Sequence, residues 1–384
     1  MSRTRLHDLA DAGQSVWLDF IDRTSLRDGS LARRIREQAL TGMTSNPTIF
    51  EKALSEGSAY DEQVSGAPAG LTTWQLFELV EADDVRSACD LFREVYTASR
   101  GADGYVSIEV SPGVANSASD TVAEARRLWA AVDRPNVMIK VPGTEEGSRA
   151  VQPLIADGIN VNVTLLFSVQ AYARIIEAYL SGLEERAARN LPLEHVASVA
   201  SFFVSRVDTE VDARLEKLAV AAPSDAERLR ELKGRTAVAN AKLAYRLFQQ
   251  KFSGARWGAL AGRGAQMQRP LWASTSTKNP AFRDVMYVEQ LIGPHTVNTM
   301  PPATFDAFLD HGETRRTVDD AVDGAERHIA ALEAVGIPLA GVTDKLLVDG
   351  LASFQHSFDG LLAGLARRTG SAARPTATAA AAAP

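Results

Sequence analysis

The sequence predicts an α/β protein, a (β/α)8 TIM barrel with extra helices in an insertion and at the C-terminus. Three observations lead to this prediction. Short β-rich runs alternate with segments of helical periodicity, which is typical of a parallel sheet. There are eight such runs, and eight strand–helix units favour a barrel over a doubly wound sheet. Several runs also carry polar residues at alternate positions, as expected of strands with one face inside a barrel.

The eight runs follow one another at intervals along the chain. They read SVWLDFI (15–21), LTGMTSN (40–46), GYVSIEVSP (104–112), NVMIKVP (136–142), INVNVTLLF (159–167), HVASVASFFVS (195–205), RPLWAST (269–275) and HTVNTMP (295–301). The fourth run, closed by Pro142 and Gly143, has the composition of a buried parallel strand.

Segments of helical periodicity lie between these runs. They include residues 72–96, 118–132, 168–190 and 225–252. A largely helical insertion is expected at about 207–268, and a helical C-terminal region ends in LLVDGLASFQHSFDGLLAGLARR. We therefore expect one barrel domain over residues 1–370. Residues 371–384 are alanine-rich and of low complexity, which predicts a disordered tail.

The composition is that of an ordinary globular protein, with 384 residues, 45% of them hydrophobic, and a formal net charge of -7. The chain has no basic block, so no nucleic-acid partner is expected. Its single cysteine, Cys89, excludes an intrachain disulfide and suits a reducing compartment. The N-terminus lacks the apolar core of a signal peptide, and no apolar run reaches the ~20 residues of a membrane span. We expect a cytoplasmic protein without a membrane partner, either a monomer or a homo-oligomer.

Polar residues occupy one face of five predicted strands near their carboxyl ends. In residues 104–112 the two faces are Val106, Ile108 and Val110 against Ser107, Glu109 and Ser111. In residues 159–167 they are Val161, Val163 and Leu165 against Asn160, Asn162 and Thr164. Across the five strands, the alternation predicts one polar cluster of Asp19, Asn46, Glu109, Lys140, Asn162 and Thr164. Barrel active sites are built at this end of the strands. Asp22 lies one residue off phase and ranks below Asp19.

Lys140 lies inside the apolar run NVMIKVP, where a buried lysine is costly unless it is paired, neutral or used chemically. A purely structural ion pair with Glu109 or Asp19 is one explanation. The other is covalent catalysis, because desolvation favours the neutral amine, which can form a Schiff base with an aldehyde or ketone. The resulting iminium accepts electrons, so that a carbon–carbon bond can break as in a retro-aldol reaction.

Such a reaction needs carboxyl groups for proton transfer, and Asp19 and Glu109 fit this task. The residues suited to holding substrate hydroxyls or a water are Asn46, Asn162, Thr164 and Ser201. A phosphate group would meet the residues at the ends of the sixth and seventh runs, which are Arg206, Ser274 and Lys278. No metal or other cofactor is expected, since the six histidines show no ligand spacing and no phosphate-binding glycine loop is present.

These residues lie in segments that resemble the transaldolase family, most closely its longer bacterial and plant-type branch. In family order the segments are WLDFIDR, GMTSNPTIF, VSIEVSP, VMIKVPGTEEG, INVNVTLLFS, SFFVSRVD and WASTSTKNP. They cover residues from about 15 to about 300. VMIKVPGTEEG and INVNVTLLFS are the most specific, although a shorter sugar-phosphate aldolase shares parts of them.

The resemblance implies a metal-independent transferase of the non-oxidative pentose phosphate pathway. Such an enzyme transfers a dihydroxyacetone unit from a ketose phosphate, sedoheptulose 7-phosphate or fructose 6-phosphate. The acceptor is an aldose phosphate, glyceraldehyde 3-phosphate or erythrose 4-phosphate.

The resemblance also implies a role for each residue. Lys140 resembles the Schiff-base lysine, Asp19 the acid that deprotonates the C4 hydroxyl, and Glu109 the acid that acts through a water. The remaining matches are Thr164 for that water, Asn46, Asn162 and Ser201 for substrate hydroxyls, and Arg206 and Ser274 for phosphate. Shorter bacterial enzymes carry an arginine just after the matching serine. Here the segment reads STSTK, which assigns the second phosphate charge to Lys278.

Two other functions fit the same residues. A class I aldolase of the fructose-6-phosphate type would release free dihydroxyacetone, and water access in the pocket decides between release and transfer. A catalytically silent sugar-phosphate binding protein on the same fold is the other, since a fold does not fix a function. A binding protein has no use for a desolvated amine, which favours an enzyme.

Overall fold

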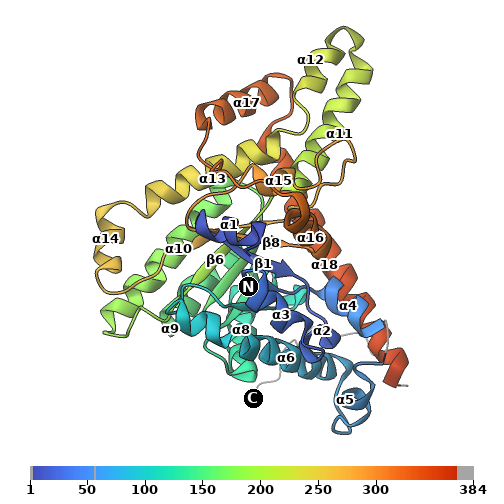
Figure 1. The fold of residues 1–384 in the computed structure, drawn as a ribbon, viewed down its shortest axis with the longest axis vertical. Helices are drawn as coiled ribbons and strands as arrows, with labels where there is room; N and C mark the ends of the chain where they lie inside the picture. Colours follow the sequence, from blue (N-terminus) through green and yellow to red (C-terminus); the bar gives the residue numbers. More distant parts are fainter. Residues whose placement is uncertain (1–2, 56–57, 370–384) are drawn as a thin grey trace, which may run out of the picture.

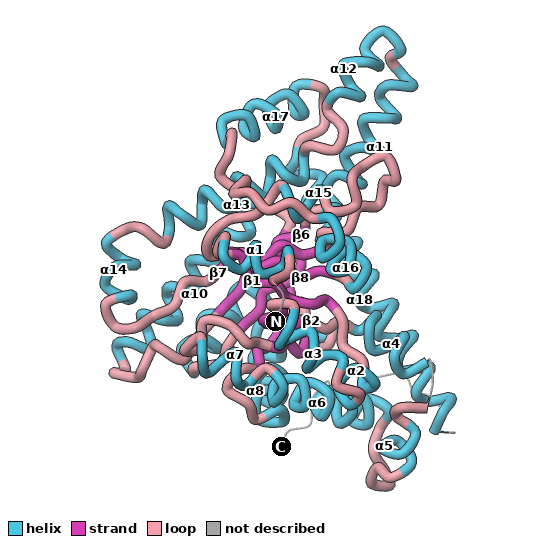
Figure 2. Tube along the Cα trace, viewed as in Figure 1, coloured by secondary structure: helices cyan, strands magenta, loops and turns pink. Residues whose placement is uncertain are grey.

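The structure, a computed structural model, describes residues 3–55 and 58–369. Within these residues eight parallel strands close into a barrel in chain order, with β1 pairing β8 (Figure 2). The strands are β1 (Gln14–Asp19), β2 (Leu40–Thr44), β3 (Val106–Glu109), β4 (Val137–Pro142), β5 (Val161–Leu166), β6 (Ser198–Phe203), β7 (Arg269–Ala273) and β8 (Thr296–Met300). The predicted (β/α)8 TIM barrel is confirmed. The predicted tail, residues 371–384, lies outside the described residues.

Helices surround the barrel and cover the outer faces of its strands (Figure 1). Those that pack directly on strands include α3 (Ser30–Glu37), α6 (Thr73–Leu91), α8 (Ala118–Val132), α9 (Glu145–Asp157), α10 (Val169–Ala188), α13 (Thr236–Lys251) and α16 (Pro302–His311). The shorter elements are α1 (Arg5–Asp11), α2 (Arg23–Arg27), α4 (Pro47–Ser55), α5 (Asp61–Ser65), α7 (Arg93–Ala98), η1 (Pro112–Val114), η2 (Pro223–Asp225), α12 (Ala226–Glu231), α14 (Ala255–Ala261) and α15 (Met286–Glu289). The longer additions are α11 (Ser205–Ala221), α17 (Val322–Ala334) and α18 (Leu339–Thr369).

Two segments with helical periodicity are each divided in the structure. Residues 72–96 form α6 and α7, which meet at the buried Phe92. Residues 225–252 form α12 and α13, and the chain turns between them at Gly234, whose φ of 69° lies in the left-handed region. The predicted insertion at 207–268 thus covers α11 except for its first two residues, and all of α12, α13 and α14. Of these, α11 and α12 project away from the barrel, whereas α13 packs on β7 (Figure 1).

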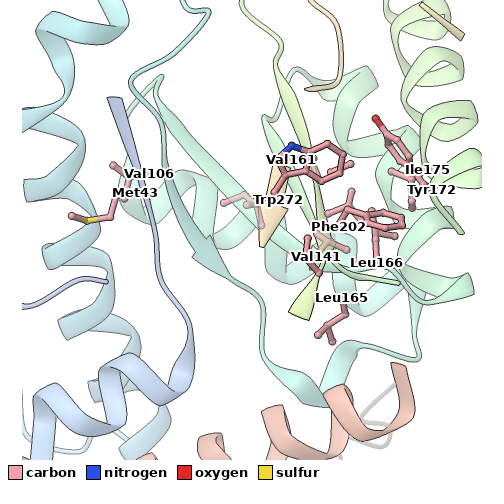
Figure 3. Packing of buried hydrophobic residues seen from close by; sticks show 14 of the residues in the cluster. Met43, Val106, Val141, Val161, Leu165, Leu166, Tyr172, Ile175, Phe202 and Trp272 are labelled. Atoms are coloured by element: carbon pink, nitrogen blue, oxygen red, sulfur yellow. The ribbon is translucent and has the colours of Figure 1, made fainter. Parts of the chain in front are cut away.

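A cluster of apolar side chains fills much of the barrel interior. They are Trp17, Tyr105, Met138, Ala197, Val199, Leu271, Ala273 and Val297. The Trp17 indole also donates a hydrogen bond of 2.7 Å to Asp103. Outward-facing strand residues, such as Val161 and Phe202, instead pack against α10 through Tyr172 and Ile175 (Figure 3). Polar side chains lie on either side of this apolar cluster, with Ser15 and Arg269 at the amino ends of β1 and β7 and the residues of the cavity at the carboxyl ends of the strands.

The predicted alternation of faces fails at two residues. Ser111 lies beyond the end of β3, and its N–H and hydroxyl donate to the Glu124 carboxylate at 2.7 and 2.9 Å, outside the barrel. Leu165 lies in β5 with a φ of 58°, where the register with β6 shifts, and it lines the cavity as well as contacting the outer core. A single left-handed residue reverses the phase of the strand beyond it.

The C-terminal helix α18 returns to the mouth of the barrel after β8. It runs along one side of the molecule, past α11 and on to α4 and α6 (Figure 1). None of the helices within the described ranges is both long and apolar enough to cross a membrane.

Candidate active site

A cavity of about 810 Å³ opens at the carboxyl ends of the strands. Each of the eight strands contributes to its lining, through Asp19, Thr44, Glu109, Lys140, Thr164, Ser201, Ala273 and Thr299. Loops after the strands add further predicted site residues, namely Asn46, Arg206, Ser274 and Lys278. Asn162 is the one predicted site residue that does not line this cavity. The volume is of the size that holds a small ligand such as a sugar phosphate.

Lys140 lies at the centre of this site. It is buried, and its Nζ donates to Glu109 Oε2 at 3.0 Å and to the Ser45 carbonyl at 3.1 Å. Glu109 and Lys140 occupy directly paired positions on β3 and β4. An amine held by two acceptors at the end of a strand has a fixed position, which is what attack on a carbonyl carbon requires.

Burial raises the pKa of the Glu109 carboxyl, and the nearby Asp19 charge raises it further. The positive charge of Lys140 and its hydrogen bond act in the opposite direction without cancelling the effect of burial. A carboxyl group with a raised pKa holds a proton more readily near neutral pH than an ordinary glutamate does. Glu109 can therefore both accept and return a proton.

Asp19 faces Lys140 from β1. Its Oδ1 accepts a hydrogen bond of 2.7 Å from Thr44, whose hydroxyl also lies 2.7 Å from that of Thr299. Burial raises the pKa of the Asp19 carboxyl, whereas the charge of Lys140, the Thr44 hydrogen bond and the charge of Arg206 lower it. Asp22, by contrast, accepts from two backbone N–H groups at the start of α2, which gives it a structural role.

Hydroxyl and amide groups surround the lysine on the side of β5 and β6. Thr164 and Ser201 are buried and line the cavity. Ser201 donates to Asn162 Oδ1 at 2.7 Å, and Asn162 Nδ2 donates to Ser107 at 2.9 Å. Asn162 thus lies behind Ser201 and sets the direction of its hydroxyl.

Asn46 contributes from the loop after β2. Its Oδ1 accepts from the Ile49 N–H at 3.1 Å, at the start of α4. The side-chain NH2 group is therefore the half of Asn46 that is suited to a substrate oxygen.

A group of basic and hydroxyl residues lies at the β6–β7 side of the cavity. Arg206 lies above the Phe203 ring, 5.2 Å from its centre, and burial lowers the pKa of its guanidinium while the Asp19 charge raises it. Ser274 has a φ of 57°, and its hydroxyl lies 2.9 Å from that of Ser205. Lys278 donates to Ser276 at 3.1 Å. Guanidinium, ammonium and hydroxyl groups together suit a phosphate group.

The prediction from sequence missed several cavity residues. Thr44 and Thr299 lie within predicted strands, and the position of Thr44 two residues before Asn46, on the same face, was a usable signal. Ser276 lies between the predicted residues Ser274 and Lys278 and was not singled out. From α18 the cavity receives Gly350, Ser353 and Phe354, for which the local sequence holds no signal. Within the described ranges, no group of three or more histidine, cysteine or acidic side chains is arranged to hold a metal ion.

Comparison with known proteins gives consistent matches over nearly the whole chain. The family described as "Transaldolase/Fructose-6-phosphate aldolase" matches residues 16–365. A protein named "Transaldolase" from Thermobifida fusca is 50% identical over 359 residues, which are 93% of this chain and 96% of that protein. Another from Frankia alni is 46% identical over 367 residues, 95% of this chain and 97% of the relative. A "Transaldolase 2" from a Nostoc species is 45% identical over 368 residues, which are 94% of this chain and 97% of that protein.

The family match begins within β1, includes the other seven strands entirely, and covers every residue of the cavity described above. These matches agree with the resemblance carried by the Lys140, Asp19 and Glu109 segments. The chain therefore belongs to the transaldolase/fructose-6-phosphate aldolase family.

Proposed function

We propose that this protein is a transaldolase that transfers a dihydroxyacetone unit between sugar phosphates through a Schiff base on Lys140. The observation that carries the proposal is the position of the Lys140 amine, 3.0 Å from Glu109 and in one cavity with Asp19 and Arg206. A nucleophile, two carboxyl groups and a phosphate-binding cation are the groups that this reaction needs.

The reaction begins with formation of the imine. Glu109 accepts the proton that leaves Lys140, and the neutral amine attacks the ketone carbon of the donor to give a carbinolamine. Glu109 then returns the proton, through a water held by Thr164, to the departing hydroxyl group. The raised pKa of Glu109 suits this exchange, because its carboxyl can hold the proton between the two steps.

Cleavage of the carbon–carbon bond follows. Asp19 takes the proton of the C4 hydroxyl, the C3–C4 bond breaks, and its electron pair moves to the iminium to form an enamine. The first aldose leaves, and an acceptor aldose takes its place. The enamine carbon then attacks the acceptor aldehyde, whose oxygen takes the proton from Asp19. Hydrolysis of the new iminium releases the product ketose, which is three carbons longer than the acceptor, and frees Lys140.

Separate groups of residues are proposed to bind the hydroxyls and the phosphate of the substrate. We assign the donor hydroxyls to Asn46 and Ser201, with Asn162 acting directly or through its hydrogen bond to Ser201. We assign the phosphate to Arg206, Ser274 and Lys278, which lie together at the β6–β7 side. Donors are sedoheptulose 7-phosphate or fructose 6-phosphate, and acceptors are glyceraldehyde 3-phosphate or erythrose 4-phosphate. A cytoplasmic location and self-association stay predictions.

The test is product formation from fructose 6-phosphate with and without erythrose 4-phosphate. Sedoheptulose 7-phosphate that forms only with the acceptor is the expected result. Free dihydroxyacetone at a comparable rate without an acceptor would identify an aldolase instead. Lys140→Ala is expected to abolish both turnover and borohydride trapping of the donor with the fold intact.

A matched control is Lys242→Ala. Lys242 is also mostly buried, but its Nζ donates to the Asp320 carbonyl at 2.8 Å, outside the cavity. This variant is expected to keep activity and trapping. Transfer activity in a folded Lys140→Ala variant would overturn the assignment of the nucleophile.

A further inference from the structure

One wall of the cavity is formed by the C-terminal helix α18, far in sequence from the strands β1, β3, β4 and β5 that carry Asp19, Glu109, Lys140 and Thr164. Gly350, Ser353 and Phe354 of α18 line the same cavity as Lys140. Their spacing of three and four residues places them on one face of the helix. Gly350 is buried and Phe354 half-buried against the barrel mouth, whereas Ser353 on the same face is exposed.

Contacts at three places hold α18 across the barrel mouth. Near its start, Lys345 forms an ion pair with Glu210 of α11 at 3.2 Å. Beyond the cavity, the Ser357 hydroxyl lies 2.7 Å from that of Thr48 in α4. One residue later, the Phe358 ring packs against Trp74 of α6 with ring centres 5.0 Å apart. The helix is thus a fixed wall, attached on both sides of the mouth.

The wall meets the barrel at Leu165, directly after Thr164. Leu165 has a left-handed backbone, and it belongs both to the buried cluster that contains Val141 and Phe202 (Figure 3) and to the cavity lining beside α18. A Cβ atom added at Gly350 would lie 3.1 Å from Leu165 Cδ2, so the helix and the side chain are in close contact. A leucine in this conformation is strained, and such strain is concentrated at functional sites.

We propose that Leu165, Gly350 and Phe354 form an apolar wall that keeps water from the enamine on Lys140 and thereby favours transfer over release. This inference rests on the proposed transaldolase function and adds the residues that set its outcome. Apolar side chains offer no hydrogen bond to a water molecule, so an ordered water at this wall is disfavoured.

Transfer and release differ in which molecule reacts first with the enamine carbon. In transfer, its electron pair forms a bond to the acceptor carbonyl carbon, and the carbonyl oxygen takes the proton held by Asp19. In release, the same carbon takes a proton from water, and that water regains a proton from Asp19. In both, one water then adds to the iminium carbon and the C–N bond breaks, with its electron pair returning to the Lys140 nitrogen. Water at the enamine before the acceptor therefore yields dihydroxyacetone.

The experiment compares Phe354→Ala with the wild-type full chain, using fructose 6-phosphate and erythrose 4-phosphate. The measured quantity is the ratio of free dihydroxyacetone to sedoheptulose 7-phosphate. Both products come from one enamine, so the ratio does not depend on how much enzyme is folded. We expect the ratio to rise about tenfold, which corresponds to ~1.4 kcal/mol between the two barriers. Val348→Ala is the control, since Val348 lies on the outer face of α18 with 66% exposure.

A second variant guards against loss of folding. Phe354→Leu retains an apolar side chain and is expected to restore a ratio close to that of the wild type. A ratio in Phe354→Ala equal to that in Val348→Ala would overturn the proposal, as would equal ratios in the alanine and leucine variants. Failure of the wild type to form sedoheptulose 7-phosphate would instead contradict the proposed function itself.

Discussion

Lys140 Nζ and Glu109 Oε2 lie 3.0 Å apart at directly paired positions of two neighbouring strands. The sequence left two explanations for this lysine, a structural ion pair and a nucleophile. The structure contains the ion pair, and it places the pair within a cavity that also holds hydroxyl and basic groups. An ion pair that served packing alone would not need this access to a cavity, and hydrophobic residues often replace such pairs without loss of stability.

Glu109→Gln is predicted to slow imine formation by roughly 100-fold or more, within the range that general acid–base catalysis contributes. The amide retains a hydrogen-bond acceptor for Lys140 but cannot take or return a proton. Single-turnover borohydride trapping of fructose 6-phosphate measures this step alone. A trapping rate equal to that of the wild type would remove Glu109 from proton transfer.

Thr44→Val is predicted to move the acidic limb of the kcat/KM profile to higher pH. The Thr44 hydroxyl lowers the pKa of Asp19, so its loss raises that pKa, and protonated Asp19 cannot accept the C4 hydroxyl proton. Thr299→Val is expected to cause a smaller shift in the same direction, because Thr299 contacts Asp19 only through Thr44. If the acidic limb of the kcat/KM profile is unshifted in both variants, it reports the titration of a group other than Asp19.

Arg206→Ala is predicted to raise KM for phosphorylated donors by about 10- to 100-fold, as expected for loss of charged hydrogen bonds of roughly 1.5–3 kcal/mol. Lys278→Ala is expected to have a smaller effect, since Lys278 is exposed to solvent at the edge of the cavity. Unphosphorylated donors serve as the comparison and should respond little to either change. An equal loss with both kinds of donor would place the phosphate elsewhere.

Asp208 provides a prediction about stability. Its carboxylate accepts from the Ala237 N–H at 2.7 Å and the Tyr287 hydroxyl at 2.9 Å, and burial raises its pKa from 3.8 to about 6. A raised pKa stabilises the fold below pH 4, and this stabilisation is lost as the pH rises through 6. The wild type should therefore lose up to ~3 kcal/mol of unfolding free energy between pH 4 and 7 relative to Asp208→Asn.

Denaturant unfolding at several pH values measures this difference. Asp225→Asn, at an exposed carboxyl group, is the matched control. If the difference in unfolding free energy between the wild type and Asp208→Asn stays constant with pH, the raised pKa of Asp208 is contradicted.

Periodicity predicted the barrel and most of the site because both depend on the alternation of side chains along single strands. Glu109 and Lys140 show this clearly, since each lies between apolar residues that face the outer helices. Alternation failed at Leu165, because one left-handed residue reverses the face of the strand and leaves the same pattern of letters. It failed at Ser111 because the strand ends before it.

The amino-acid pattern alone predicted the eight strands, the inward phase of the polar residues and the chemistry open to a lysine among carboxyl groups. Each of these depends on neighbours within a few residues. The tertiary structure alone decided that Gly350 of α18 meets Leu165 at the barrel mouth. The path of a terminal helix depends on distant contacts such as Phe358 with Trp74, and no local pattern encodes them. The residues that we propose for the reaction were thus evident in the sequence, whereas those that we propose to enclose it became evident only in the fold.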